Sequence, residues 1–149
     1  MPADSVKNWL DLHGVTSEEL RLFLHRVPAQ MPTKPILEQV DHSPQQIWDS
    51  TVSILCRRFP DVASQINDVS QAVDCKFFTD TQRPFTVHPN DGAATQIHLN
   101  YRFDTNSVLA VAHECGHAVQ AGLVTRIRPP IYREISAMLS ERAFTESML

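Results

Sequence analysis

The sequence predicts a single α+β domain in which helices come first, a small antiparallel sheet follows, and two further helices come after the sheet. Three observations predict this order. Apolar residues recur with helical spacing over about 44–74, short β-like runs follow over 76–101, and a mostly apolar segment begins after the capping residues 104–107. The change from helical to strand-like spacing near residue 75 divides the domain into two parts.

Residues 1–40 are expected to form a helical lead-in whose role the sequence does not reveal. Thr16 and Glu19 stand three residues apart at the start of an apolar run, which is the capping-box pattern of a helix N-terminus. The prolines within 28–36 exclude a regular helix there, so this stretch is expected to be a linker.

Two longer helices are expected next. Ser43 is a favourable cap and Pro44 a favourable first residue, so the first helix should run over about 44–58. Pro60 should begin the second helix, which is expected to end near Asp74. Both segments carry apolar residues at helical spacing, so one face of each helix should be buried.

Short β-like runs follow at 76–78, 84–87 and 96–101, and the turn sequence Pro89-Asn90-Asp91-Gly92 separates the last two. We expect these runs to pair as a small antiparallel sheet. In the last run, side chains alternate between the two faces of the strand. One face carries the apolar residues Ile97, Leu99 and Tyr101, and the other carries the polar residues Gln96, His98 and Asn100.

Two helices are expected after the sheet. The capping cluster 104–107 precedes the apolar segment 108–121, so a largely buried helix should begin here and end at Gly122. After the break at Pro129-Pro130, a final helix should run from about Ile131 to near the last residue. Residues 75–149 are therefore expected to form the functional core.

Length and composition limit the functional classes. A chain of 149 residues with 42% apolar and 20% charged residues fits one globular domain. Its net charge of −4 argues against a general nucleic-acid binder, which needs a basic surface. The three cysteines form no CxxC pair. The sequence shows no basic stretch followed by an apolar leader, as a signal peptide would have. No apolar run is long enough to span a membrane. We expect a cytoplasmic protein without membrane or nucleic-acid partners; export without a cleaved leader and the oligomeric state stay open.

The segment His113-Glu114-Cys115-Gly116-His117 has the HExxH pattern inside an expected helix. Residues i and i+4 lie on one face of a helix, about 6 Å apart along its axis. His113 and His117 can therefore bind one zinc ion, whose bonds to imidazole nitrogen are about 2.0–2.1 Å long. Glu114 points about 100° round the helix and can act as general base toward a zinc-activated water. The alternative is a helix with two buried histidines that carbonyl groups satisfy, which carries a desolvation cost.

A catalytic zinc needs a third protein ligand and an open position. No histidine follows His117, so the downstream glutamates are the candidates. Glu134, in the first turn of the final helix, is the expected third ligand, and Glu141, two turns later on the same face, is expected to accept a hydrogen bond from a ligand histidine. The alternatives are a favourable charge at the helix N-terminus for Glu134, and an ion pair with Arg133 or Arg142 for Glu141.

HExxH with a downstream helical glutamate resembles the gluzincin clan of zinc peptidases. The stretches IHLNYRFDTNSVLAVAHECGHAVQ and PPIYREISAMLSE most resemble the catalytic core of the thimet oligopeptidase/oligoendopeptidase F family, over about residues 95–145. The resemblance implies a zincin-like fold and a zinc-dependent peptidase with one zinc ion per chain. Several positions match functional residues of that family: the zinc ligands His113, His117 and Glu134, the general base Glu114, and the second glutamate of the last helix, Glu141.

The sequence also departs from that family. Its members are several times longer, and their oxyanion-stabilising histidine and tyrosine lie far downstream of the zinc site. Minigluzincins show that a compact zinc core exists without those additions. Residues 1–75 resemble no family.

Two further residues are candidates for the site. Tyr132 stands two residues before Glu134, where its phenol would donate to an oxyanion; the alternative is a tyrosine that only packs. His98 lies on the polar face of the strand before the zinc helix, where the backbone of a zincin pairs with an extended substrate; the alternative is a solvated strand face.

The sequence therefore predicts a zinc-dependent peptidase that acts on a peptide or protein substrate. Two other hypotheses stand beside it. One is a zinc-binding regulatory or interaction domain without turnover. The other is a latent enzyme whose cleft is blocked by residues 1–40 or by the last few residues.

Overall fold

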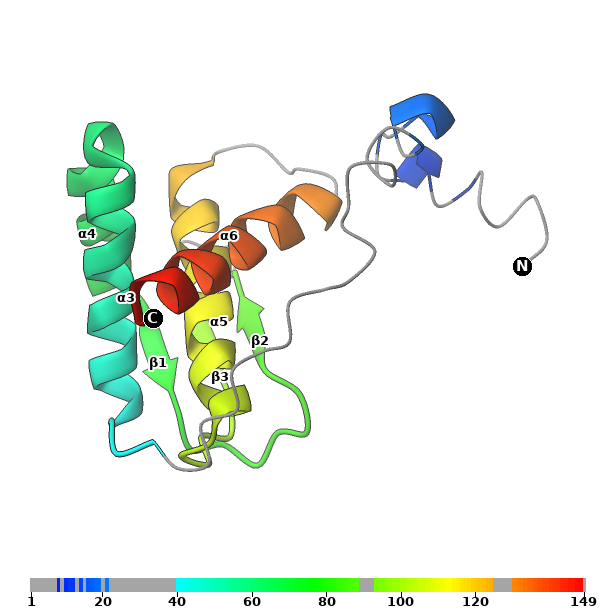
Figure 1. The fold of residues 1–149 in the computed structure, drawn as a ribbon. Helices are drawn as coiled ribbons and strands as arrows, with labels where there is room; N and C mark the ends of the chain where they lie inside the picture. Colours follow the sequence, from blue (N-terminus) through cyan, green and yellow to red (C-terminus); the bar gives the residue numbers. More distant parts are fainter. Residues whose placement is uncertain are drawn as a thin grey trace.

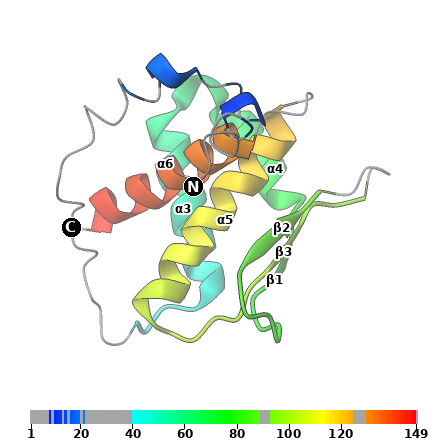
Figure 2. The ribbon, with the colours of Figure 1, turned by 90° about the vertical axis from the view of Figure 1, so that its right-hand side faces the viewer.

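A long helix, α5 (Thr105–Leu123), lies between a three-stranded sheet on one side and helix α6 (Pro130–Met148) on the other (Figure 1 and Figure 2). Helices α3 (Pro44–Arg58) and α4 (Ala63–Gln71) pack beside α5. The computed structural model describes residues 8, 10–12, 14, 16–19, 21, 40–88, 93–124 and 130–148. These residues confirm the α+β class, and most of them are helical.

The helix boundaries before the sheet follow the capping residues. Ser43 caps α3 by accepting from the Gln46 backbone N–H, and the Gln46 side chain accepts in turn from the Ser43 N–H. The predicted helix over 44–58 is confirmed. The segment from Pro60 is helical as expected, but it opens with the 3₁₀ turn η1 (Pro60–Val62) and α4 ends at Gln71.

Strands β1 (Asp74–Lys76), β2 (Phe85–Val87) and β3 (Gln96–His98) form the sheet in the order β1-β3-β2. β2 is antiparallel to β3, but β1 is parallel to it, so the expectation of an antiparallel sheet is wrong for this pair. The reason is topological. The chain leaves β1, forms β2 at the far edge, and then turns back into the middle of the sheet as β3.

The two helices after the sheet are confirmed, and one glycine has a different role from the expected one. Asp104 caps α5 through the Ser107 backbone N–H, at 2.8 Å. The helix does not stop at Gly122 but continues to Leu123. A Cβ atom on Gly122 would lie 2.4 Å from a methyl carbon of Val69 on α4, so this glycine permits helix packing.

Part of the N-terminal lead-in lies within the described residues. The Thr16 backbone N–H donates to the Glu19 carboxylate at 2.8 Å, and the Glu19 N–H donates to the Thr16 hydroxyl at 3.2 Å. The predicted capping box is therefore confirmed. The linker expected over 28–36 lies outside the described residues.

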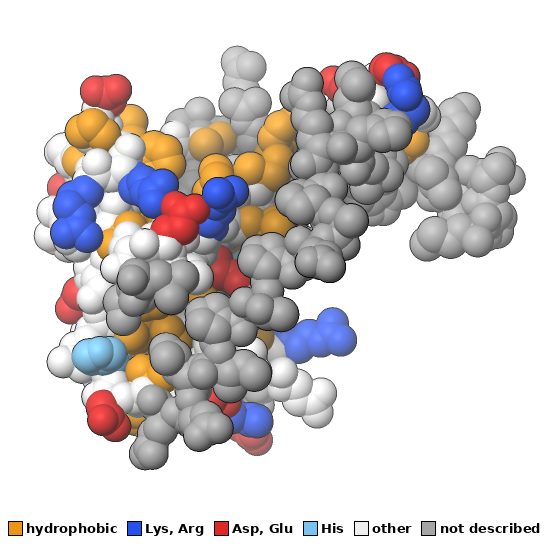
Figure 3. Space-filling model, viewed as in Figure 1, with side chains coloured by type: hydrophobic (Ala, Val, Ile, Leu, Met, Phe, Trp, Pro, Cys, Tyr) orange, Lys and Arg blue, Asp and Glu red, His pale blue; other side chains and the backbone are white. Residues whose placement is uncertain are grey.

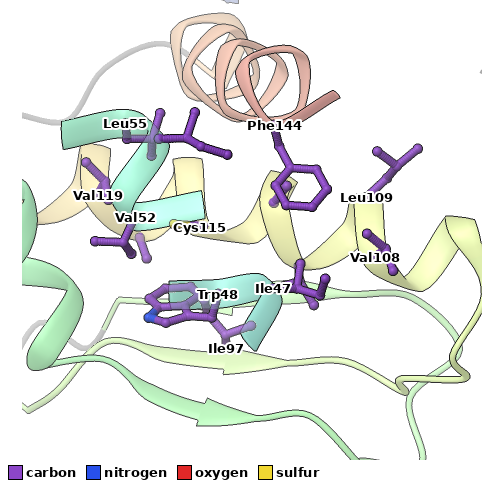
Figure 4. Close-up of a cluster of buried hydrophobic side chains, with 14 of the residues drawn as sticks. Ile47, Trp48, Val52, Leu55, Ile97, Val108, Leu109, Cys115, Val119 and Phe144 are labelled. Carbon is purple, nitrogen blue, oxygen red and sulfur yellow. The ribbon is translucent and has the colours of Figure 1, made fainter. Parts of the chain in front are cut away.

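The hydrophobic core surrounds α5 and joins all the layers (Figure 4). Trp48 of α3 and Ile97 of β3 pack beneath α5, whereas Phe144 of α6 packs above it. The buried residues of α5 itself include four that are fully inaccessible, at 0% exposure: Val111, Ala112, Cys115 and Ala118. Burial of this helix on several sides explains why its sequence is apolar round most of its circumference.

The outer side of α6 remains apolar. Hydrophobic side chains are visible over α6 in Figure 3. Four large apolar side chains of α6 are exposed: Tyr132, Ile135, Met138 and Leu139. Among the described residues, no helix combines the length and the hydropathy that a membrane crossing needs.

The contact between α5 and α6 depends on the absence of a side chain at Gly116. A Cβ atom there would lie 2.6 Å from the Ser136 carbonyl oxygen and 2.7 Å from the Ala137 Cα, and both are backbone atoms of α6. The fully buried Ala137 and the Ser140 hydroxyl, which donates to the Ala112 carbonyl at 2.6 Å, complete the contact. The two helices therefore approach more closely than any larger residue at position 116 would allow.

We expect Gly116→Ala to lower the free energy of unfolding by about 1–3 kcal/mol, because the added methyl group would displace the α6 backbone. Urea unfolding followed by circular dichroism measures this change. Ser64→Ala, at an exposed position of α4, is the control and should change stability little. An unchanged unfolding midpoint in Gly116→Ala would contradict the close helix contact.

Candidate metal centre

Three potential metal ligands converge between α5 and α6. His113 and His117 lie one turn apart on α5, and Glu134 lies near the start of α6. One donor atom from each residue lies within 4.8 Å of the other two. The imidazole rings have centroids 4.9 Å apart and planes at 80°, so the two rings present different edges to a common point.

The Glu134 carboxylate faces both histidines. Its two oxygens lie 3.6 Å from His113 Nε2 and 3.7 Å from His117 Nε2. These distances exceed those of ordinary hydrogen bonds. They are close to the separation of about 3.3–3.4 Å between two ligand atoms placed tetrahedrally round a zinc ion at 2.0–2.1 Å. The donor set, two imidazoles and a carboxylate, is one that catalytic zinc sites use.

Contacts between the helices hold Glu134 in place. Gly116, between the two histidines, lets α6 approach α5 closely. One turn further along α5, the Gln120 amide donates to the Tyr132 carbonyl at 2.9 Å and accepts from the Ser136 hydroxyl at 2.9 Å. These bonds attach residues on both sides of Glu134 to α5, so the carboxylate is positioned by regular helices.

Glu141 lies on the other side of the His113 ring. Its carboxylate is 3.4 Å from His113 Nδ1, while Nε2 of the same ring faces Glu134. A carboxylate in this position fixes the orientation of a ligand imidazole and increases its basicity. In agreement, the interaction with Glu141 raises the pKa of His113, and burial opposes the rise. Arg142, a candidate partner for Glu141, forms an ion pair with Glu146 at 2.7 Å.

Glu114 lies outside the three-donor cluster and points toward the sheet. Its carboxyl group is buried, at 4% exposure, and accepts a hydrogen bond of 2.5 Å from the Thr86 hydroxyl of β2. Burial raises the pKa of Glu114, and the bond from Thr86 opposes the rise. Glu114 therefore has the environment of a group that exchanges protons rather than that of a surface carboxylate.

Thr86 is the residue of this site that sequence reasoning missed. Its strand was expected, but a three-residue strand gives no signal of which side chain meets α5. Pairing with the buried Ile97 turns Thr86 toward α5. Only the register between β2 and β3 reveals this orientation.

The structure does not bring Tyr132 or His98 to the cluster. Tyr132 precedes Glu134 by two residues, about 200° round the helix, and its side chain is 47% exposed. His98 pairs with Phe85, and its ring stacks on that of Phe85 at 4.8 Å. Its neighbour Ile97 faces α5, so His98 lies on the opposite face of the sheet.

The cysteines do not belong to the cluster of potential metal ligands. Cys56, Cys75 and Cys115 are free thiols. Cys115 lies within the motif but is fully buried, and burial raises its pKa. Burial also raises the pKa of Cys75 to about 12. Thiols in such surroundings stay protonated and act as small apolar groups.

Comparison of the chain with protein-family models, curated proteins and solved structures found no match.

We expect the protein to bind one zinc ion per chain and His117→Ala to weaken this binding by more than about 100-fold. Loss of a partner that merely orients a ligand already costs about 10–100-fold in affinity. Competition with a chromophoric chelator measures the dissociation constants. His98→Ala removes a histidine from the far face of the sheet and should leave zinc affinity unchanged. Equal affinity in wild type and His117→Ala would contradict the site.

Glu141→Gln should weaken zinc binding by about 10–100-fold, because the amide no longer provides a negative charge beside His113 Nδ1. The same competition assay applies. Glu146→Gln is the matched control, because Glu146 pairs with Arg58 and Arg142 and not with a ligand. A loss of affinity in Glu146→Gln as large as that in Glu141→Gln would show a general effect of negative charge.

Proposed function

We propose that the protein is a zinc-dependent peptidase. One observation carries this proposal: a cluster of two histidines and a glutamate is accompanied by a buried carboxyl group, Glu114, that does not belong to the cluster. A purely structural zinc site needs four protein ligands and no adjacent base. A hydrolytic site needs three ligands, an open position and a base.

Each residue has a defined part in the proposed reaction. His113, His117 and Glu134 would hold the zinc ion, which when bound polarises a carbonyl group and makes a water molecule a stronger nucleophile. Glu114 accepts a proton from the attacking water and passes it to the leaving amine. The raised pKa of Glu114 suits both transfers, because a carboxyl group of ordinary acidity holds a proton poorly near neutral pH. The Thr86 hydroxyl orients the carboxyl group.

An extended peptide chain would approach along β2. Sequence reasoning assigned substrate pairing to the strand before the zinc helix, but that strand, β3, is the middle strand and pairs on both sides. β2 is an edge strand, and its Thr86 reaches the proposed base. Backbone pairing with such an edge binds extended peptides with little dependence on their side chains. Glu134 is 58% exposed, so the cluster is open to a substrate.

A zinc-binding domain without turnover is the second candidate. The same exposure of Glu134 favours it, because an open site excludes little water and gains little electrostatic stabilisation. Blockage of the cleft by residues 1–40, the third hypothesis, concerns residues that lie mostly outside the described ranges.

We expect Glu114→Gln to abolish peptide hydrolysis while zinc content and fold are retained, because glutamine keeps the size and the hydrogen bond to Thr86 but cannot accept the proton. Cleavage of a mixture of synthetic peptides by zinc-loaded protein, followed by mass spectrometry, measures the activity. Glu146→Gln should cleave at the wild-type rate. Zinc-loaded wild type that cleaves nothing would support the second candidate, and full activity in Glu114→Gln would exclude Glu114 as the base.

A further inference from the structure

His88 continues the edge strand β2 on the side of the sheet that faces α5. Val87, the last residue of β2, pairs with Gln96, so His88 and Thr95 are the next residues along these two antiparallel strands. His88 Nδ1 lies 3.1 Å from the Thr95 hydroxyl, so the two side chains lie next to each other just beyond the last pair of the ladder. Side chains alternate along a strand, so His88 lies on the same face as Thr86.

The direction of β2 places His88 beside the metal cluster. Thr86 contacts Glu114, and β2 and α5 point the same way along the molecule (Figure 1). A step of two residues along a strand covers about 6.6 Å, and a step from Glu114 to His117 covers about 4.5 Å along the helix. His88 therefore lies level with the His117 end of the cluster. The electrostatic interaction with His88 lowers the pKa of His117, which agrees with this placement.

The His88 imidazole can be a hydrogen-bond donor toward the cleft. When the Thr95 hydroxyl donates to Nδ1, the ring proton of a neutral imidazole is on Nε2. Burial and the nearby charge of Arg133 lower the pKa of His88, so the neutral ring is favoured. The side chain is exposed, so a substrate on β2 has access to it.

We propose that His88 donates a hydrogen bond from Nε2 to the oxygen of the substrate carbonyl as negative charge develops there. This inference rests on the proposed peptidase function. As the water oxygen bonds to the carbonyl carbon, the π electrons of the C=O bond move to the oxygen, and the His88 N–H stabilises it without transferring its proton. The electron pair on that oxygen then re-forms the C=O bond as the C–N bond breaks with its electron pair on nitrogen, and the nitrogen takes the proton that Glu114 holds. Removal of such a donor typically costs about 100–1,000-fold in kcat.

Two zinc-binding probes distinguish this role from a structural one. A phosphinic pseudodipeptide with Phe and Ala side chains has a tetrahedral centre that places a second oxygen where the oxyanion would form. 2-Phenylethanethiol binds zinc through one sulfur atom and has no such oxygen. Isothermal titration of zinc-loaded protein should show that His88→Ala binds the phosphinic compound at least 10-fold more weakly than wild type and binds the thiol equally. His88→Gln, which keeps a side-chain N–H, should recover part of the loss.

His98→Ala is the matched control, because His98 lies on the opposite face of the same sheet and should not affect either probe. Equal phosphinic affinity in wild type and His88→Ala would overturn the role of His88 alone. The role of His88 would also be overturned if Arg133→Ala weakened binding of the phosphinic compound and His88→Ala did not. Zinc-loaded wild type that binds neither probe would contradict the proposed peptidase, and with it the role of His88.

Discussion

The close approach of α6 to α5 at Gly116 is the constraint on which the rest of the site depends. The two histidines belong to one helix and the facing carboxylate to another, so their distances are set by how these helices pack. Backbone atoms of α6 lie where a side chain at position 116 would be, and the Ser140 hydroxyl reaches the Ala112 carbonyl across the same contact. Helices that approach through small residues at regular positions hold side chains more precisely than loops do.

Burial of polar groups in an apolar helix is costly, and the structure shows how the cost is offset. Glu114 accepts from Thr86, and one nitrogen of His113 faces Glu141. From the sequence, backbone carbonyl groups were an alternative set of hydrogen-bond partners for the two histidines. In the structure, carboxylate groups face the histidines instead. The Glu134 oxygens lie beyond hydrogen-bonding distance of both Nε2 atoms, at 3.6 and 3.7 Å. This spacing is compatible with a metal ion between these atoms.

Local signals predicted the helices and the motif, whereas the sheet required non-local information. Capping at Ser43 and Asp104 and the spacing of His113 and His117 depend on neighbours in sequence, so they were predictable. Alternation in a strand reveals two faces but neither strand order nor direction. For this reason the sequence assigned substrate pairing to β3, which is paired on both sides, and associated His98 with the cleft, whereas the contact of Thr86 with Glu114 was not foreseen. Glu134 was predictable because few downstream acids were available.

X-ray absorption at the zinc edge of the purified protein reports the ligands of the metal themselves. We expect a first shell of nitrogen and oxygen atoms at about 2.0–2.1 Å, with the outer-shell scattering of two imidazole rings. A shell containing sulfur at about 2.3 Å would show that cysteines bind the metal. That result, or a spectrum without imidazole scattering, would contradict a site formed by His113, His117 and Glu134.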